Sequence, residues 1–373
     1  MGFIAEINRE LLRSLSNEYN DNWDSERFGK ESRGLLETFR SKVKRLMLLF
    51  GWLRYTSALP DKLYACLLAR LPEDEKTIAT YNRLADEVSR QWFVKLIAYR
   101  ILGYRKVKLP TNTREYREAG KLALRLCDTS RNVPARFENW NLPYANLNSI
   151  GFPITAHTTP GAIASFFIQK QYSLREEDVN ISVESGDTVL DCGGCWGDTS
   201  LLFAHQAGPE GAVYTFEFMP DNISILTKNM DMNPILRDRI NLVQHPLWST
   251  SDVEIAISGT GPGAKIDLSE SGAEALRFKT IAIDDFVERN LISNVDFIKM
   301  DIEGAELDSL KGAERTLRRH RPKLAISIYH RSSDFVDIPS YLESLNLSYK
   351  YFIRHHTIHG EETVLYATCN FEK

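Results

Sequence analysis

The sequence has no apolar run long enough to cross a bilayer. Its longest apolar stretch, residues 46–53, is interrupted by Gly51 and bordered by basic side chains, whereas a membrane-spanning helix needs about 20 apolar residues. The chain starts with an acidic and polar pattern and not with a basic segment before an apolar core, so no secretory signal is predicted. Its 5 cysteines are odd in number and irregularly spaced, which indicates reduced thiols. These absences predict a cytoplasmic protein.

The chain as a whole also lacks a large excess of charge of either sign, but its two parts differ in net charge. The formal net charge is -4, yet residues 1–150 hold 26 Lys and Arg against 18 Asp and Glu, and the remainder holds 20 against 32. A basic half can belong to a non-catalytic module that binds an anionic surface. It also occurs where basic helices face solvent or complement an acidic region. The basic stretch 90–125 lacks the aromatic interleaving of known nucleic-acid modules, so we expect no nucleic-acid partner.

Two regions of different periodicity divide the chain. Residues 1–150 show mainly helical spacing, especially over Glu73–Gly103 and Tyr116–Cys127, and helical additions of this kind often serve as oligomer surfaces. The Asn-, Pro- and Gly-rich stretch Ser130–Pro160 predicts an irregular connection. Residues 151–373 alternate short apolar runs with helical segments, which predicts right-handed crossovers and a parallel sheet.

The strands expected in the second region are short apolar runs, and a closing pair predicts an antiparallel hairpin. They are Thr188–Cys192, Ala212–Glu217, Ile240–Val243, Phe297–Asp301 and Lys323–His330, with the closing pair Tyr349–His355 and Thr363–Cys369 and two extra strands at Val253–Ser258 and Phe278–Ile283. The expected helices are Gly161–Tyr172, Ser200–Gln206, Asn222–Met230, Ala305–His320 and Pro339–Leu345.

The most informative motif is VLDCGGCWG, residues 189–197. A buried strand delivers Asp191 at its carboxyl end, where open α/β sheets bind ligands, and Gly193, Gly194 and Gly197 allow a sharp turn and close approach. Glu217 ends the next strand, where a carboxylate can accept hydrogen bonds from ribose hydroxyls. A dinucleotide site uses G-x-G-x-x-G instead, and Asp191 beside a pyrophosphate would repel it. The pattern therefore favours an S-adenosylmethionine site.

Several segments together resemble the FkbM-type methyltransferases. They are GDTVLDCGGCWGDTSLLFA (186–204), VYTFEFMPDNISILTKNM (213–230), FIKMDIEGAELDSLKGAERTL (297–317), PKLAISIYH (322–330) and RHHTIHGEETVLYA (354–367). The resemblance implies a Rossmann-like class I methyltransferase sheet, mostly parallel with an antiparallel C-terminal hairpin, preceded here by a mainly helical N-terminal region. It also implies methylation of hydroxyls on sugars or polyketide-type metabolites.

Carried over to this sequence, the resemblance places Asp191, the three glycines and Glu217 at the donor site. The segment Gln244–Trp248, with Leu247 and Trp248, is expected to contact adenine. The sequence departs from the common pattern at Phe218-Met219-Pro220, in the loop that follows the expected ribose contact, where Glu-Pro is more usual. Phe218 is nevertheless included among the expected donor residues.

Methyl transfer to an alcohol needs orientation and a base. His330 ends the fifth strand and Asp301 the fourth, so both are expected to face the crevice as catalytic residues. Asp301 and Glu303, within D-I-E-G-A-E, have the oxygen donors that Mg²⁺ prefers. Each has a structural alternative, because a strand-end histidine can bind a backbone carbonyl and acidic residues also favour a helix N-terminus.

Two further groups have open interpretations. His355, His356 and His359 stand in RHHTIHG without the partners of a zinc site, and we expect them to line the acceptor pocket, unless they only belong to a turn. Cys192 and Cys195 form a C-x-x-C, which in this position favours small-residue packing over redox chemistry.

The sequence thus predicts an S-adenosylmethionine-dependent O-methyltransferase acting on a small, sugar-containing acceptor. One alternative keeps the donor but changes the acceptor to a protein, a lipid or a nitrogen nucleophile. D-I-E-G stands where nitrogen-methylating enzymes often carry an N/D-P-P-Y/F-type motif, which argues against nucleic-acid bases. The other alternative is the non-catalytic anionic-surface module.

Overall fold

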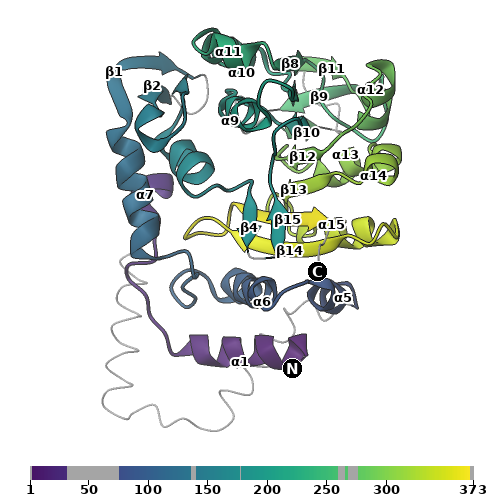
Figure 1. Ribbon diagram of the computed structural model, residues 1–373. Helices are drawn as coiled ribbons and strands as arrows, with labels where there is room; N and C mark the ends of the chain where they lie inside the picture. Colours follow the sequence, from purple (N-terminus) through teal and green to yellow (C-terminus); the bar gives the residue numbers. More distant parts are fainter. Residues whose placement is uncertain are drawn as a thin grey trace, which may run out of the picture.

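A seven-stranded, mostly parallel sheet organises the protein (Figure 1). The structure is a computed structural model that describes residues 2–31, 75–135, 140–176, 178–258, 265–267 and 276–369. The sheet contains β6 (Thr188–Cys192), β7 (Ala212–Phe216), β8 (Ile240–Val243), β12 (Phe297–Met300), β13 (Lys323–Ser327), β14 (Lys350–His355) and β15 (Thr363–Thr368). Its order is β14-β15-β13-β12-β6-β7-β8, with β15 antiparallel to both neighbours. This is the class I methyltransferase sheet, so the predicted fold class is confirmed.

Helices cover both faces because the central strands are buried on both sides. All four residues of β12 are buried, and near-continuous apolar runs of this kind are typical of parallel strands. One face packs against α9 (Asp198–Ala207) and α10 (Pro220–Asp231), with Leu201 and Leu226 in the shared core. The other face packs against α12 (Ile283–Arg289), α14 (Glu314–His320) and α15 (Asp334–Ser344).

The N-terminal helices share that second core. These are α1 (Phe3–Leu15), α5 (Glu75–Arg83) and α6 (Glu87–Leu102), and Figure 1 shows them below β14. Phe3 and Phe93 belong to the same cluster of buried side chains as Ile326 and Ile338 of the sheet side. The boundary expected at residue 150 stays a prediction, but α6 packs against β14, α1 packs against α6, and α5 packs against α15.

The stretch expected to be an irregular connection contains strands instead. β1 (Cys127–Pro134), β2 (Asn141–Asn146) and β3 (Thr155–His157) form a three-stranded antiparallel sheet. β1 is mostly exposed, so its sequence has no apolar alternation to reveal it. Turn-forming residues such as Asn and Pro therefore led to the prediction of a loop where the structure has a small antiparallel sheet.

Two long predicted helices are broken. Residues 305–320 form α13 (Glu306–Lys311) and α14, separated at Gly312, where a Cβ atom would lie 2.3 Å from the carbonyl oxygen of Trp248. The pattern over Glu73–Gly103 splits into α5 and α6, because the Asp86 side chain caps α6 by accepting from the Ser89 backbone N–H at 2.5 Å.

Three strand predictions were also wrong in their limits. The extra strand expected at Phe278–Ile283 is β11 (Leu276–Lys279), and α12 begins at Ile283. β13 ends at Ser327, which leaves His330 in the following turn, and β12 ends one residue before Asp301. The chemistry-bearing residues therefore follow the strands on loops.

The other elements are short or peripheral. They are α2 (Ser25–Phe28), α7 (Arg114–Arg125), η1 (Asn148–Ile150), α8 (Pro160–Ala162), the π-helical η2 (Ile163–Ile168), β4 (Leu174–Glu176), β5 (Val179–Ile181), α11 (Pro234–Arg237), β9 (Glu254–Ser258) and β10 (Lys265–Asp267). Within the described ranges, no helix combines the length and apolarity needed to span a membrane. The apolar stretch 46–53 lies outside the described residues.

Candidate active site

Asp191 lies at the base of the glycine-rich loop 193–197 that follows β6, called the donor loop here because the sequence predicts the donor site there. Its carboxylate is fully buried, and Oδ2 accepts hydrogen bonds from Thr199 Oγ1 at 2.8 Å and Ser200 Oγ at 2.7 Å. Both hydroxyls lie in the first turn of α9. Asp191 therefore ties the end of β6 to the helix that follows the glycines, and its contacts in this structure are with the protein.

Lys299 is the counterion of Asp191, and the sequence interpretation missed it. Its ammonium group lies 3.2 Å from Asp191 Oδ1 and donates to the carbonyl oxygens of Cys192 at 3.2 Å and Gly193 at 2.6 Å. Although the side chain is only 2% exposed, the group stays charged. Burial lowers its pKa, but the charges of Asp191 and Asp301 raise it above the ordinary value. The sequence feature that could have revealed Lys299 is a lysine within the otherwise apolar strand FIKM.

The glycines are needed for packing against neighbouring protein as well as for the turn. A Cβ atom on Gly193, whose φ is 87°, would lie 2.0 Å from the carbonyl oxygen of Asp301. A Cβ atom on Gly194 would lie 2.1 Å from Thr215 Cγ2. The backbone N–H of Asp301 in turn donates to the Cys192 carbonyl at 3.0 Å. The donor loop and the loop after β12 are thus in direct backbone contact.

Glu217 lies at the end of β7, beside this loop. Its Oε1 accepts from the backbone N–H groups of Phe218 and Met219, both at 2.8 Å, and its Oε2 accepts from Asn222 Nδ2 at 3.1 Å. Burial raises the pKa of Glu217 to about 7 despite these hydrogen bonds. The Phe218 ring packs edge-on against Phe278 of β11, with 5.1 Å between the ring centroids. β11 therefore covers the loop that follows Glu217.

The predicted adenine segment follows β8. Leu247 is buried and forms a bridge with Ile281, and the Trp248 backbone N–H donates to the Ile281 carbonyl at 3.1 Å. Leu247 belongs to the same core cluster as Phe216 at the end of β7. The segment is thereby fixed near the strand that carries Glu217.

Asp301 lies at the centre of a cluster of acidic and phenolic groups. Tyr172 donates to its Oδ2 at 2.7 Å and Tyr329 to its Oδ1 at 3.3 Å. Burial raises the pKa of Asp301, but the charges of His330 and Lys299 and the hydrogen bond from Tyr172 bring it below the ordinary value. Asp301 is therefore ionised at neutral pH.

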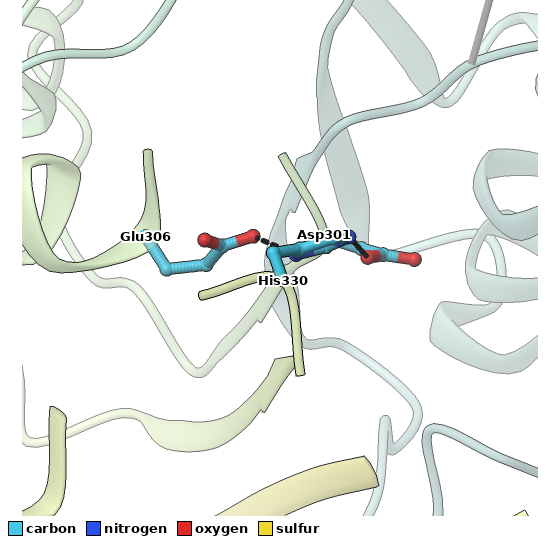
Figure 2. A group of neighbouring side chains, drawn as sticks. All are labelled: Asp301, Glu306 and His330. Atoms are coloured by element: carbon cyan, nitrogen blue, oxygen red, sulfur yellow. Dashed lines mark hydrogen bonds and ion pairs between the residues drawn. The ribbon is translucent and has the colours of Figure 1, made fainter. Parts of the chain in front are cut away.

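His330 lies between carboxylates (Figure 2). Its Nδ1 is 2.8 Å from Glu306 Oε1, and its Nε2 is 3.4 Å from Asp301 Oδ1 and 3.8 Å from Glu303 Oε1. Burial lowers its pKa, but the hydrogen bond with Glu306 and the three carboxylate charges raise it to about 10. In this environment the ring is protonated at neutral pH, which does not suit the predicted role of general base.

Glu362, the residue before β15, completes the cluster and was not predicted from the sequence. Its carboxylate accepts from Gln171 Nε2 at 2.5 Å and from Tyr329 at 3.2 Å. Burial and the charge of Asp301 raise its pKa to about 7. Glu362 lies within the segment 354–367 that resembles the family, but only the fold shows that it lies near Asp301.

The three histidines expected at the acceptor pocket are buried in the hairpin. His355 pairs through Nδ1 with Thr363 Oγ1 at 2.8 Å and through Nε2 with the His359 carbonyl at 2.7 Å. His356 Nε2 lies 2.9 Å from the hydroxyl of Tyr366, and His359 Nε2 is 3.6 Å from Asp24. Burial lowers the pKa of His355 and His356 to about 3. These contacts favour packing and hydrogen bonding over acceptor binding.

The C-x-x-C pair fits the packing interpretation. Cys192 and Cys195 are free thiols. Burial raises the pKa of both, so neither is a reactive thiolate at neutral pH.

Comparison with known proteins agrees with this geometry. Residues 186–351 match the model of the methyltransferase FkbM domain. The hexuronic acid methyltransferase AglP of Haloferax volcanii is 28% identical over 166 residues, which cover 44% of this chain and 65% of that protein. The chain thus spans just under two thirds of the length of this relative. Residues 186–351 are thus similar to methyltransferase domains of the FkbM type.

Solved structures give similar matches. The crystal structure of methyltransferase FkbM from Methylobacillus flagellatus is 22% identical, with a TM-score of 0.49, and the match covers 78% of this chain and 58% of that one. Fibrillarin from Aeropyrum pernix, solved with S-adenosyl-L-methionine, is 16% identical, with a TM-score of 0.35, and the match covers 64% and 99% of the two chains.

Proposed function

We propose that this protein is an S-adenosylmethionine-dependent O-methyltransferase whose acceptor is a hydroxyl of a sugar or glycosylated metabolite. The observation that carries the proposal is the direct contact between the donor loop and the acidic cluster, in which Asp301 donates its backbone N–H to Cys192 at 3.0 Å. A donor held by the glycine loop would have its reactive group beside the side chains of the cluster. Methyl transfer needs this proximity.

The residues of the site fit the methyl donor chemically. Asp301, Glu303, Glu306 and Glu362 surround a single histidine ring among the described residues, so the acceptor side of the site carries a surplus of negative charge. A sulfonium and an ammonium group are cationic and would be stabilised there. Glu217 and Gln244–Trp248 are the residues we assign to ribose and adenine, and each carboxylate oxygen of Glu217 has lone pairs for a further hydrogen bond. The bound donor supplies an electrophilic methyl group.

The acceptor hydroxyl must lose a proton as it attacks. Glu362 has a pKa of about 7, which suits proton acceptance near neutral pH better than the protonated ring of His330 does. Asp301 is ionised and held by two phenols, so it is placed to orient the hydroxyl. We therefore assign the base to Glu362 and the orienting role to Asp301.

The acceptor class is supported by the relative that methylates a hexuronic acid. The anionic-surface alternative is weakened by the ion pairs of the basic stretch. Lys95 pairs with Glu10, Arg105 with Glu31 at 2.8 Å, Lys106 with Glu18 at 3.0 Å and Lys108 with Asp21 at 3.2 Å. Acidic residues of the same N-terminal region thus neutralise much of the basic surface.

Calorimetry with S-adenosylhomocysteine tests the donor site. We expect saturable binding to the full chain that is weakened at least about tenfold by Glu217→Ala, because two ribose hydrogen bonds of roughly 1 kcal/mol each are lost. The control is Glu210→Ala, an exposed carboxylate in the turn before β7. Absence of binding to the wild-type chain would refute the assignment.

Transfer of a labelled methyl group to a panel of sugars then tests the acceptor. We expect Glu362→Gln to keep donor binding and to lower turnover by about 10²-fold or more, as removal of a general base does. Unchanged turnover in this variant would remove Glu362 from the mechanism. Labelling of polypeptide or lipid but no sugar would favour the alternative acceptors.

A further inference from the structure

The two nitrogens of the His330 ring have different surroundings (Figure 2). Nδ1 lies 2.8 Å from Oε1 of Glu306, and the same oxygen accepts from the Ile302 backbone N–H at 2.9 Å. Glu306 is fully buried, so its carboxylate is held in one place. Nδ1 therefore donates its proton to Glu306, which fixes the orientation of the ring and presents Nε2 on the opposite side.

Nε2 makes no hydrogen bond with any residue that the structure describes, although the His330 side chain is only 6% exposed. It faces Asp301 Oδ1 at 3.4 Å and Glu303 Oε1 at 3.8 Å. These separations are long for hydrogen bonds. The 3.4 Å separation from Asp301 lies within the range of about 3 to 3.5 Å between neighbouring ligands that each stand roughly 2.1 Å from one metal ion, and the separation from Glu303 is somewhat longer.

We propose that Nε2 of His330, Oδ1 of Asp301 and Oε1 of Glu303 bind a divalent transition-metal ion, with Glu306 holding the imidazole from behind. A donor set of one imidazole and two carboxylates suits Mn²⁺, Co²⁺ or Zn²⁺ better than Mg²⁺, which prefers oxygen ligands and several waters. The inference thus changes the ion expected from the sequence and adds His330 and Glu306 to Asp301 and Glu303.

The surroundings of the three ligands fit such a site. Tyr172 and Tyr329 hold the Asp301 carboxylate by hydrogen bonds at 2.7 and 3.3 Å. The Asp301 and Glu303 side chains are 20% and 29% exposed, so the cluster has an accessible side as well as a buried one. An ion there would keep coordination positions open to a small molecule.

The negative charge of the cluster also favours the binding of a cation. Asp301, Glu303 and Glu306 place carboxylate oxygens 3.4, 3.8 and 2.8 Å from the ring nitrogens of His330. A divalent ion would neutralise more of this carboxylate charge than a proton on the ring does, and it binds the neutral form of the imidazole.

The role we infer for this ion rests on the proposed function. It would polarise the acceptor hydroxyl and favour loss of its proton to the Glu362 carboxylate. The hydroxyl oxygen then forms the bond to the methyl carbon, the bond from that carbon to the sulfonium sulfur breaks, and the donor leaves as a neutral thioether. No electron enters or leaves the system, so the ion keeps its oxidation state.

Titration calorimetry with MnCl₂ on the chelator-treated full chain at pH 8 tests the site. We expect one saturable site that is weakened at least about tenfold in Glu303→Gln and about 10- to 100-fold in Glu306→Gln, which removes the group that orients the ring. The matched control is Glu288→Gln, an exposed carboxylate that pairs with Arg315, and its affinity should equal that of the wild type. Glu303 is partly exposed, so this variant keeps the test valid if the buried ones fail to fold.

Cobalt substitution gives a second measurement. The visible absorption of Co²⁺ bound to the wild type should change in His330→Gln, because a nitrogen ligand is lost. No saturable binding at millimolar Mn²⁺, or equal affinity in the wild type and Glu303→Gln, would overturn the proposal. S-adenosylhomocysteine binding is measured on the same samples: metal binding without donor binding refutes the proposed function, and donor binding without metal binding refutes only the metal site.

Discussion

The donor side and the acceptor side of the site treat buried charge in opposite ways. On the donor side, Asp191 and Lys299 form an ion pair at 3.2 Å, Asp191 Oδ2 accepts from two hydroxyl groups, and the Lys299 ammonium group donates to two carbonyl oxygens. On the acceptor side, Asp301, Glu303 and Glu306 lie around the His330 ring, and His330 Nε2 and Glu306 Oε2 have no hydrogen-bond partner among the described residues.

We interpret this contrast as a division between residues that fix the shape of the site and residues that interact with the reacting groups. A fully paired charge group stabilises one loop conformation, because breaking it leaves an uncompensated ion in a medium of low dielectric constant. A group with surplus charge raises the free energy of the empty site and gains most when a cation or a reacting group arrives. Under the proposed function, the motif with the glycines would shape the donor site, and the loop after β12 would carry the reacting groups.

Removing the countercharge on the donor side should have the largest effect on stability. Lys299→Met leaves Asp191 buried and unpaired, and we expect a loss of about 3–5 kcal/mol in the free energy of unfolding, measured by urea denaturation. Lys311→Met, which breaks an exposed pair with Asp308 at 3.0 Å, is the control and should cost less than about 1 kcal/mol. An equal loss in the free energy of unfolding for Lys299→Met and Lys311→Met would contradict the structural importance of the buried pair.

Filling the contact between the two loops should have the next largest effect. Gly193→Ala places a Cβ atom 2.0 Å from the Asp301 carbonyl at a φ of 87°, whereas Gly186→Ala has a φ of 91° and no atom within 4 Å of the added Cβ. Both variants share the cost of the left-handed conformation, so their difference isolates the clash, about 1–3 kcal/mol. Thermal unfolding measures it, and calorimetry should show weaker S-adenosylhomocysteine binding in Gly193→Ala alone. Equal stabilities would mean that the loops can separate freely.

The sequence predicted the elements in which apolar periodicity is strong. The β6, β7, β8, β12, β14 and β15 strands lie close to their predicted positions because buried parallel strands are short apolar runs with clear ends. It failed for β1, an exposed edge strand without alternation, and for the break at Gly312, which depends on the distant carbonyl of Trp248. Contacts that are remote in sequence leave no local pattern.

The same limit applies to the site. Asp191, the glycines and Asp301 were predicted as site residues because they follow recognisable strands, whereas Lys299 lies within a strand and Glu362 within a hairpin. The ion-pair partner of Lys299, Asp191, and the neighbour of Glu362, Asp301, each lie more than 50 residues away along the chain. The assignment of the histidine-rich stretch to the acceptor pocket stays a prediction, and the structure shows hydrogen bonds of His355 and His356 within the hairpin. Residue type predicted which chemistry was available, and only the fold determined where it acts.

The smallest expected effect concerns Glu217, a donor-side carboxyl group whose hydrogen-bond donors are two backbone N–H groups and the Asn222 amide. Its pKa is raised to about 7 in the folded protein from 4.5, so its contribution to stability is full below pH 4.5 and is lost as the pH rises through 7. The free energy of unfolding of the wild type, relative to Glu217→Gln, should therefore fall by on the order of 1–3 kcal/mol between pH 4.5 and 8, measured by urea denaturation. Gln keeps an oxygen for the backbone N–H groups of Phe218 and Met219, so the loop is retained. The exposed Glu210→Gln is the control, and its difference from the wild type should stay constant with pH. A constant difference for Glu217→Gln as well would place this carboxylate among the compensated charges of the donor side.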